Sequence, residues 1–258
     1  SPDPVAVLMA SLSPEQKIGQ LFITSFGDTS TAADSDIGRL IGEGHVGGII
    51  LSSTNHNFVN NATTPRQVAT MTNDLQTLAL ASNAGIPLFV AVDQEGDGYP
   101  YTRVTGGMTA LPDPMAIGAT WNPQNAAAVG EITGRELAGI GVNLLLGPDV
   151  DVLNNPRPVG RGDMGTRTFG GDPWWVAQMG RAYICGVHQG AAGRVATVAK
   201  HFPGHGGSDR LPDQEIATVD KSLTELKRIE LPPFFAVTSA EAPGDCAVTD
   251  AMMTSHIR

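Results

Sequence analysis

Short apolar runs alternate with helical patterns along the whole chain of 258 residues, and this alternation most constrains its fold. The runs are continuously apolar, which is typical of parallel strands buried on both faces. A strand–helix–strand order predicts βαβ units and a parallel sheet, so the fold class is α/β. The expected strands are residues 18–24, 46–52, 87–92, 142–146, 195–199 and 246–249.

Helix-start signals occupy the intervals between the apolar runs. An N-cap residue followed by proline occurs at Thr64-Pro65, Asn122-Pro123 and Asp172-Pro173, and each pair predicts a helix beginning there. Ser222 and Glu225 have the spacing of a capping box. Residues 1–13 are expected to be a loose N-terminal arm or part of an opening helix.

Composition narrows the classes of function. Hydrophobic residues make up 41% and charged residues 16%, which is typical of a soluble globular chain. The formal charge of −10 argues against a nucleic-acid partner, because phosphate binding needs a basic surface. No apolar stretch reaches the roughly 20 residues of a membrane span. Cys185 and Cys246 each lie in an apolar run and are expected to be buried free thiols. The sequence assigns neither an oligomeric state nor a compartment.

The run Lys200-His201-Phe202-Pro203-Gly204-His205-Gly206 is the most informative segment. It follows the predicted strand 195–199, so a lysine and two histidines are expected where that strand gives way to a glycine-rich turn. The glycines allow close backbone approach to a ligand. In a βα barrel the active-site residues follow the C-terminal ends of the strands. The run therefore predicts a site that binds an anionic or hydroxyl-rich ligand.

This run, together with residues 91–96, 147–152, 167–173 and 253–257, resembles the motifs of the family 3 glycoside hydrolases, in particular the β-N-acetylglucosaminidase branch. The motifs occur in the family's order from about residue 14 onward. The resemblance implies a TIM-type (β/α)8 barrel domain over residues 14–258. About six strand–helix units are visible, so the barrel is expected to be incomplete within this chain.

The resemblance also implies which side chains contact the terminal sugar. His205, Glu95 and Asp151 are expected to order the site rather than to bind the sugar. Tyr99 and Tyr101 offer a possible stacking platform for a sugar ring. The five expected sugar contacts are Asp93, Arg103, Arg167, Lys200 and His201.

The catalytic groups are harder to assign. In the resembling branch, an Asp-Ser-His segment follows the glycine-rich run, and its histidine is the general acid/base; here no histidine lies between His205 and His256. The available carboxylates are Asp209, Asp213 and Glu215, and Asp209 is the preferred candidate because it follows a serine. The nucleophile is expected after a seventh strand, beyond residue 258. Asp250 is a weaker candidate for that role.

The function implied is that of an O-glycosyl hydrolase in carbohydrate metabolism. It would cleave a terminal β-linked sugar, with N-acetylhexosamine favoured, by a retaining mechanism that needs no cofactor. One alternative is a sugar-binding barrel that lacks both catalytic groups. A second is a phosphate-binding barrel enzyme. A metal site is not expected, because Pro203 and Gly204 break the helix that the His-x3-His spacing of His201 and His205 assumes.

Overall fold

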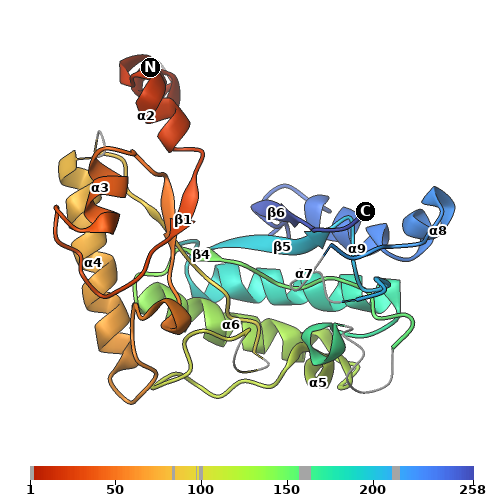
Figure 1. The fold of residues 1–258 in the computed structure, drawn as a ribbon. Coiled ribbons are helices and arrows are strands. Elements are labelled where there is room, and N and C mark those ends of the chain that lie inside the picture. The colour runs from red at the N-terminus through yellow and green to blue at the C-terminus, as the bar shows by residue number, and fades with distance from the viewer. Residues whose placement is uncertain (1–2, 83–84, 97, 99–100, 157–163, 211–215) are drawn as a thin grey trace. The chain divides into compact units, whose positions relative to one another are not determined.

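The computed structural model describes residues 3–82, 85–96, 98, 101–156, 164–210 and 216–258, and its ribbon is drawn in Figure 1. The chain divides into two compact units. Unit 1 comprises residues 1–92, 106–108 and 139–143, and unit 2 comprises residues 93–105, 109–138 and 144–258. Among the described residues no helix is long and apolar enough to cross a membrane.

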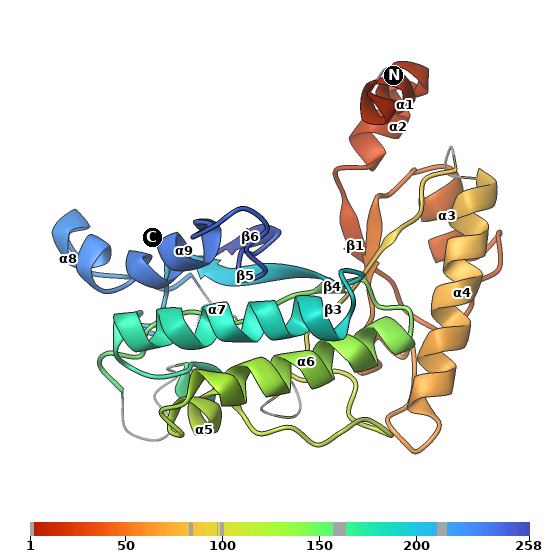
Figure 2. The same ribbon diagram turned by 180° about the vertical axis from the view of Figure 1, so that it is seen from behind.

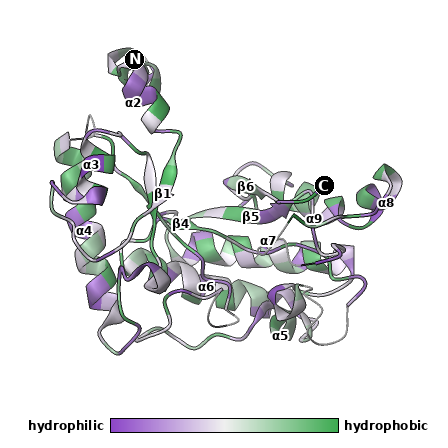
Figure 3. Ribbon diagram, viewed as in Figure 1, coloured by the Kyte–Doolittle hydropathy of each residue, from purple (hydrophilic) through white to green (hydrophobic). Residues whose placement is uncertain are grey.

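Unit 1 contains three parallel strands in the order of the sequence, β1 (Ile23–Ser25), β2 (Gly48–Ile50) and β3 (Phe89–Val92). Its longest helix, α4 (Thr64–Ser82), buries Val68, Met71, Leu75 and Ala79 at three- and four-residue spacing, and Figure 3 shows hydrophobic and hydrophilic residues mixed along it. The helices are α1 (Pro4–Ser11), α2 (Pro14–Gly19), α3 (Asp36–Gly42), the 3-10 turn η1 (Ser53–Asn55) and α4 (Thr64–Ser82).

The start of unit 1 corrects the prediction of a strand over residues 18–24. Ile18 belongs to α2, which Ser13 and Gln16 begin with a reciprocal capping box. That cap directs the backbone into a helix through Gly19, so the strand begins only at Ile23. The predicted start of α4 at Thr64 is confirmed.

Unit 2 contains the other three strands, β4 (Leu144–Leu145), β5 (Ala196–Phe202) and β6 (Ala251–Thr254), again parallel and in sequence order. The long helices α6 (Pro123–Gly139) and α7 (Pro173–Gly190) run side by side, and β5 lies along the other side of α7 (Figures 1 and 2). The other helices of unit 2 are α5 (Pro114–Gly118), the 3-10 turn η2 (Gly165–Arg167), α8 (Leu223–Arg228) and α9 (Leu231–Thr238). Parallel strands with helices between them confirm the α/β prediction.

Two strand boundaries in unit 2 differ from the sequence prediction. β5 continues through Lys200 and His201 to Phe202, so these two side chains extend from the strand itself and not from the turn after it. The sixth strand lies at 251–254 rather than 246–249. The predicted helix starts at Pro123 and Pro173 and the capping box of Ser222 with Glu225 are confirmed.

Small residues bring α6 and α7 into backbone contact. A Cβ atom added at Gly186 would lie 2.1 Å from the carbonyl oxygen of Ala127, and one added at Gly130 would lie 2.2 Å from that of Tyr183. Gly134 and Gly190 show the same crowding. Only hydrogen fits at these positions, so the glycines set how closely the two helices approach.

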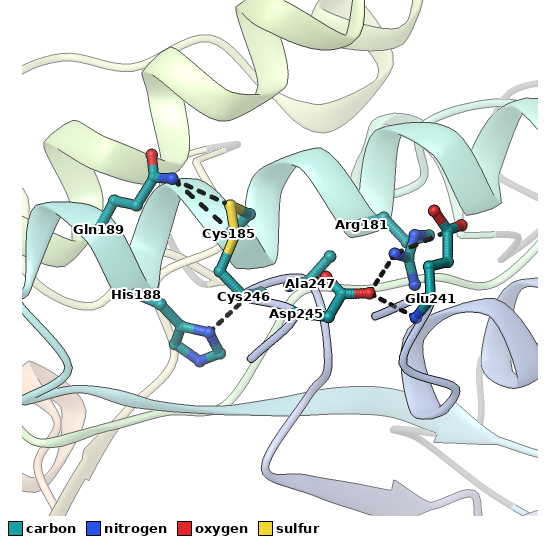
Figure 4. Close-up of a disulfide and its surroundings, with 8 residues drawn as sticks. All are labelled: Arg181, Cys185, His188, Gln189, Glu241, Asp245, Cys246 and Ala247. Carbon is teal, nitrogen blue, oxygen red and sulfur yellow. Dashed lines mark hydrogen bonds and ion pairs between the residues drawn. A yellow bond between two sulfur atoms is a disulfide. The ribbon is translucent and has the colours of Figure 1, made fainter. Parts of the chain in front are cut away.

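The expectation of free thiols is wrong. Cys185 on α7 and Cys246, in the segment before β6, form a disulfide with a Cα–Cα distance of 4.6 Å (Figure 4). The Nδ1 atom of His188 lies 2.7 Å from the carbonyl oxygen of Cys246. Arg181, which precedes Cys185 by one turn of α7, forms an ion pair with Asp245 at 2.6 Å. The disulfide and these contacts hold the segment before β6 against α7.

Candidate active site

A buried lysine between two carboxylates forms the centre of the candidate site. The Nζ atom of Lys200 lies 2.9 Å from Asp93 Oδ1 and 2.5 Å from Glu95 Oε1. Asp93 and Glu95 follow β3 at a spacing of two residues, which places both side chains on one face of an extended chain. The side chains of Lys200 and Glu95 are each 2% exposed, whereas that of Asp93 is 25% exposed. Asp93 is therefore the member of the trio that a ligand can reach.

Arg167 completes a second, buried ion pair with the same glutamate. Its Nε atom donates to Glu95 Oε2 at 2.7 Å and its second terminal nitrogen donates to Oε1 at 3.0 Å. The guanidinium carbon also lies 3.9 Å from the centre of the Tyr101 ring. One face of Tyr101 is thus covered by Arg167, and Tyr99 lies outside the described residues. Glu95 orders both cations, in agreement with its expected structural role.

Arg103 lies at the open side of Asp93. Its Nε atom is 3.9 Å from Asp93 Oδ2, and its backbone N–H donates to the carbonyl of Asp93. The two side chains are exposed to about the same extent, 24% and 25%. The structure therefore brings Asp93, Arg103, Arg167 and Lys200 together as one charged cluster.

The charges in this cluster stabilise one another. Burial alone would raise the pKa of Glu95, but Lys200 and Arg167 outweigh it and lower that pKa to about 2. Burial would likewise lower the pKa of Lys200, but the carboxylates of Glu95 and Asp93 keep it above its usual value. Both groups are consequently ionised near neutral pH, and Lys200 is a fixed positive charge beneath Asp93.

His201 projects from β5 and is held by a carboxylate from the segment after β4. Its Nδ1 atom lies 2.8 Å from Asp151 Oδ2. Burial lowers the pKa of His201 more than Asp151 raises it, so the imidazole is neutral near pH 7. Within the described part of the chain its Nε2 atom has no hydrogen-bond partner. A neutral imidazole with one free ring nitrogen suits hydrogen bonding to a hydroxyl group.

Three further side chains surround His201. Asp151 accepts a hydrogen bond from the backbone N–H of His205, whose ring stacks on that of His201 with centroids 4.1 Å apart. Asp149 is also buried, and burial together with the negative charge of Asp151 raises its pKa well above the usual range. The expected ordering role of Asp151 and His205 agrees with these contacts.

Asp209 lies on the loop after β5 in surroundings that favour its ionised form. It accepts hydrogen bonds from Arg210 at 2.7 Å and from the backbone of Thr218 at 2.8 Å. These contacts lower the pKa of Asp209 to about 2, and the hydrogen bond from Arg210 has the largest effect. A general acid needs the opposite shift, so the prediction that Asp209 transfers a proton stays a prediction and requires these contacts to open. Asp213 and Glu215 lie outside the described residues.

Asp250 lies near the other end of β5. Its Oδ2 atom accepts from the backbone N–H of Thr197 at 2.7 Å and lies 3.0 Å from His188 Nε2. Thr197 precedes Lys200 by three residues, which is about 10 Å along a strand. The carboxylate of Asp250 therefore anchors the start of β6 and does not face a ligand held at Lys200.

A cavity of about 400 Å³ borders the charged cluster without forming part of it. It lies between the segment 94–113 and the helices α6 and α7, and Glu95, Thr133 and Tyr183 contribute to its wall. Asp93, Lys200 and His201 do not line it. We therefore place the candidate site at the exposed side of Asp93 and not in this cavity.

The sequence analysis did not predict how closely two residues, Glu95 and Asp149, would contact the other side chains of the site. Glu95 contacts both buried cations, and Asp149 reaches within 3.9 Å of His201. A signal was present in each case, because Asp93 with Glu95, and Asp149 with Asp151, are carboxylate pairs two residues apart at a predicted strand end. Side chains at that spacing share one face, so the second carboxylate of each pair joins the same site.

Comparison with known proteins identifies the family of the chain and supports the assignment of its fold. Residues 13–258 match the family model described as the glycosyl hydrolase family 3 N-terminal domain. The chain is 31% identical over 96% of its length to β-hexosaminidase A of Pseudoalteromonas piscicida, of which it spans 41%. It is 33% identical over 93% of its length to a β-hexosaminidase of Pseudomonas aeruginosa, of which it spans 63%.

Solved structures give the same result. A glycoside hydrolase family 3 β-N-acetylglucosaminidase from Paenibacillus sp. superposes with a TM-score of 0.81 at 34% identity, covering 96% of this chain and 42% of that one. A β-N-acetylhexosaminidase from Beutenbergia cavernae superposes with a TM-score of 0.76 at 28% identity, covering 95% and 68%. The six parallel strand–helix units thus match the barrel domain of these hydrolases, as the sequence predicted.

Proposed function

Because the chain belongs to glycosyl hydrolase family 3, we propose that it supplies the sugar-binding site of a hydrolase that removes a terminal β-linked N-acetylhexosamine. The relatives of similar sequence are named β-hexosaminidases, which favours this reading over a barrel that only binds sugar. The chain spans 41% and 63% of those two relatives, so the activity is proposed for the native polypeptide that carries this chain.

The observation that carries the proposal is that the Asp93 side chain is partly exposed while Lys200, which contacts it, is buried. A pyranose presents neighbouring hydroxyl groups that both donate and accept hydrogen bonds. Asp93 accepts from such hydroxyls, and Lys200 holds its Oδ1 atom in place through a contact of 2.9 Å. Arg103 is the donor at the exposed side, and His201 offers its free ring nitrogen. Arg167 acts in this proposal through Glu95, which places it.

The proposed reaction is displacement at the anomeric carbon with retention of configuration. In the first step a carboxylate attacks that carbon, the glycosidic bond breaks, and the departing oxygen takes a proton from the general acid. In the second step water displaces the carboxylate and gives a proton back to the same acid/base group. The proposal leaves the nucleophile to sequence following Arg258, since Asp250 faces away from Lys200. Asp209 is the acid/base candidate only in a conformation that separates it from Arg210.

The test is hydrolysis of two aryl substrates by the native polypeptide. We expect turnover of 4-nitrophenyl N-acetyl-β-glucosaminide, with 4-nitrophenol released first and the free sugar then released as its β-anomer. The matched 4-nitrophenyl β-glucoside should be cleaved with a lower kcat/KM. Absence of turnover with tight binding of N-acetylglucosamine would instead support the sugar-binding alternative.

A further inference from the structure

A buried carboxylate that the proposed reaction does not use lies against the turn after β5. Glu230 is the residue before α9, and it is fully buried. Its carboxylate forms an ion pair with the Nζ atom of Lys221, whose side chain is 12% exposed. The same Nζ atom donates to Asn154 Oδ1 at 3.1 Å. The ion pair thus joins the start of α9 to the segment before α8 and to the segment after β4.

Two glycines of this turn, Gly204 and Gly207, pack directly on the ion pair. A Cβ atom added at Gly204 would lie 2.7 Å from Glu230 Oε2. One added at Gly207 would lie 3.0 Å from Glu230 Oε1 and 2.8 Å from Lys221 Cε. Gly204 also has a φ of +113°, which residues other than glycine rarely adopt. The backbone of the turn therefore follows the surface of the ion pair, and the position of the pair sets the path of the turn.

The turn carries groups of the candidate site. His205 lies between the two glycines, and its ring stacks on that of His201 with centroids 4.1 Å apart. Asp209, the acid/base candidate, follows Gly207 by two residues. A shift of the turn would therefore move Asp209 relative to a sugar bound at His201.

The ion pair is costly to bury. Burial raises the pKa of Glu230, Lys221 opposes that shift, and the negative charge of Asp151 adds to it. Among the described residues, Glu230 Oε2 is a buried oxygen with no hydrogen-bond partner. Buried ion pairs often stabilise a fold no better than well-packed apolar residues of similar size. Stability alone therefore gives no reason for a charged pair at this position, whereas fixing the path of an active-site turn gives one.

We propose that Glu230 is a positioning residue for glycoside cleavage, which acts through Lys221 and the turn 204–207 to place the proton donor on the loop after β5. This inference rests on the proposed function, in which Asp209 is the candidate donor. Proton donation matters most when the departing oxygen is strongly basic, and it matters little for 4-nitrophenoxide. A misplaced donor should therefore impair the cleavage of poor leaving groups selectively, whereas a loss of folded protein would impair all substrates equally.

The test compares two substrates of the native polypeptide that differ only in their leaving group, phenyl and 4-nitrophenyl N-acetyl-β-glucosaminide. The value of kcat/KM is measured for each, because it reports formation of the glycosyl–enzyme. Circular dichroism of each variant establishes that it is folded.

Two variants disturb the turn in different ways. Glu230→Ala removes the carboxylate that lies against it. Gly207→Ala leaves Glu230 in place, but its methyl group would displace the flexible end of Lys221. The matched control is Glu225→Ala, which removes an exposed carboxylate from α8.

We expect Glu230→Ala to lower kcat/KM by about 10–100-fold for the phenyl glycoside and by less than about 3-fold for the 4-nitrophenyl glycoside. Gly207→Ala should change the ratio of the two values in the same direction, and it decides the matter should Glu230→Ala fail to fold. Glu225→Ala should leave both values unchanged.

Equal losses on the two substrates in folded variants, or no loss on either, would overturn the positioning role while leaving the proposed function intact. Absence of turnover by the wild type would overturn the proposed function and this inference with it. The two failures are therefore distinguishable.

Discussion

Lys200 Nζ and Glu95 Oε1 lie 2.5 Å apart with both side chains 2% exposed, which makes this ion pair the buried anchor of the candidate site. Glu95 also holds Arg167 through two hydrogen bonds. Removal of a buried carboxylate that pairs with two cations leaves excess positive charge in the interior. The pair therefore links the stability of unit 2 to the geometry of its site.

Replacement of the anchor carboxylate tests that link. We expect Glu95→Gln to lower the free energy of unfolding by about 3–5 kcal/mol, because the buried Lys200 and Arg167 would lose the negative charge that they share, and Lys200 would keep only its contact with the partly exposed Asp93 among those described. The matched control is Glu131→Gln, which removes an exposed ion pair with Arg135 on α6 and should cost less than about 1 kcal/mol. Urea unfolding of both variants measures the difference. Equal effects of the two substitutions would contradict the anchoring role.

Acid stability should report the same carboxylate. The pKa of Glu95 is lowered from 4.5 to about 2 in the folded state, so the unfolded chain takes up this proton first as the pH falls. The resulting stabilisation is present above pH 4.5 and is lost progressively between pH 4.5 and about pH 2. The stability difference between wild type and Glu95→Gln should shrink across this range. A difference independent of pH would be inconsistent with an ionised Glu95.

The contact between α6 and α7 predicts a sharp difference between two glycines. Gly186→Ala places a methyl group 2.1 Å from the Ala127 carbonyl, so we expect a loss of about 1–3 kcal/mol. At Gly139, the last residue of α6, no atom would lie within 4 Å of the new methyl group. Gly139→Ala should leave stability unchanged or raise it by up to about 1 kcal/mol. Thermal unfolding of both variants decides whether the helices are as close as described.

The disulfide predicts a redox-dependent stability. Cys185 and Cys246 are 61 residues apart, so the bond restricts a long loop of the unfolded chain. Reduction, or the double substitution Cys185→Ser with Cys246→Ser, should lower the free energy of unfolding by about 2–4 kcal/mol. Adding reductant to the double variant should then have no further effect. Free thiols detected in the folded, unreduced protein would contradict this bond.

The sequence predicted the order of strands and most helix starts because local signals determine them. Proline after an N-cap residue marks α6 and α7, and the capping box marks α8. The end of β5 was missed because Lys200 is polar, whereas its charge is neutralised by Asp93 and Glu95, more than 100 residues earlier in the chain. Only tertiary contacts make a strand of that segment.

The same limit applies to the site and to the cysteines. Strand ends and the family resemblance together selected Asp93, Arg103, Arg167 and Lys200, which the structure does bring together. The pairing of Cys185 with Cys246 depends on how the segment before β6 folds back on α7, and no local pattern encodes it. The contacts of Asp209 with Arg210 and Thr218 are likewise set by loop geometry.

The most direct test of the central claim is the kcat/KM of the native polypeptide for 4-nitrophenyl N-acetyl-β-glucosaminide after Asp93→Asn. The exposed Asp36 of α3 provides the matched control, Asp36→Asn. Loss of a charged acceptor for the sugar hydroxyls should lower kcat/KM by about 10–100-fold or more, while the control retains wild-type activity. A folded Asp93→Asn enzyme with undiminished kcat/KM would contradict the assignment of this cluster as the sugar-binding site.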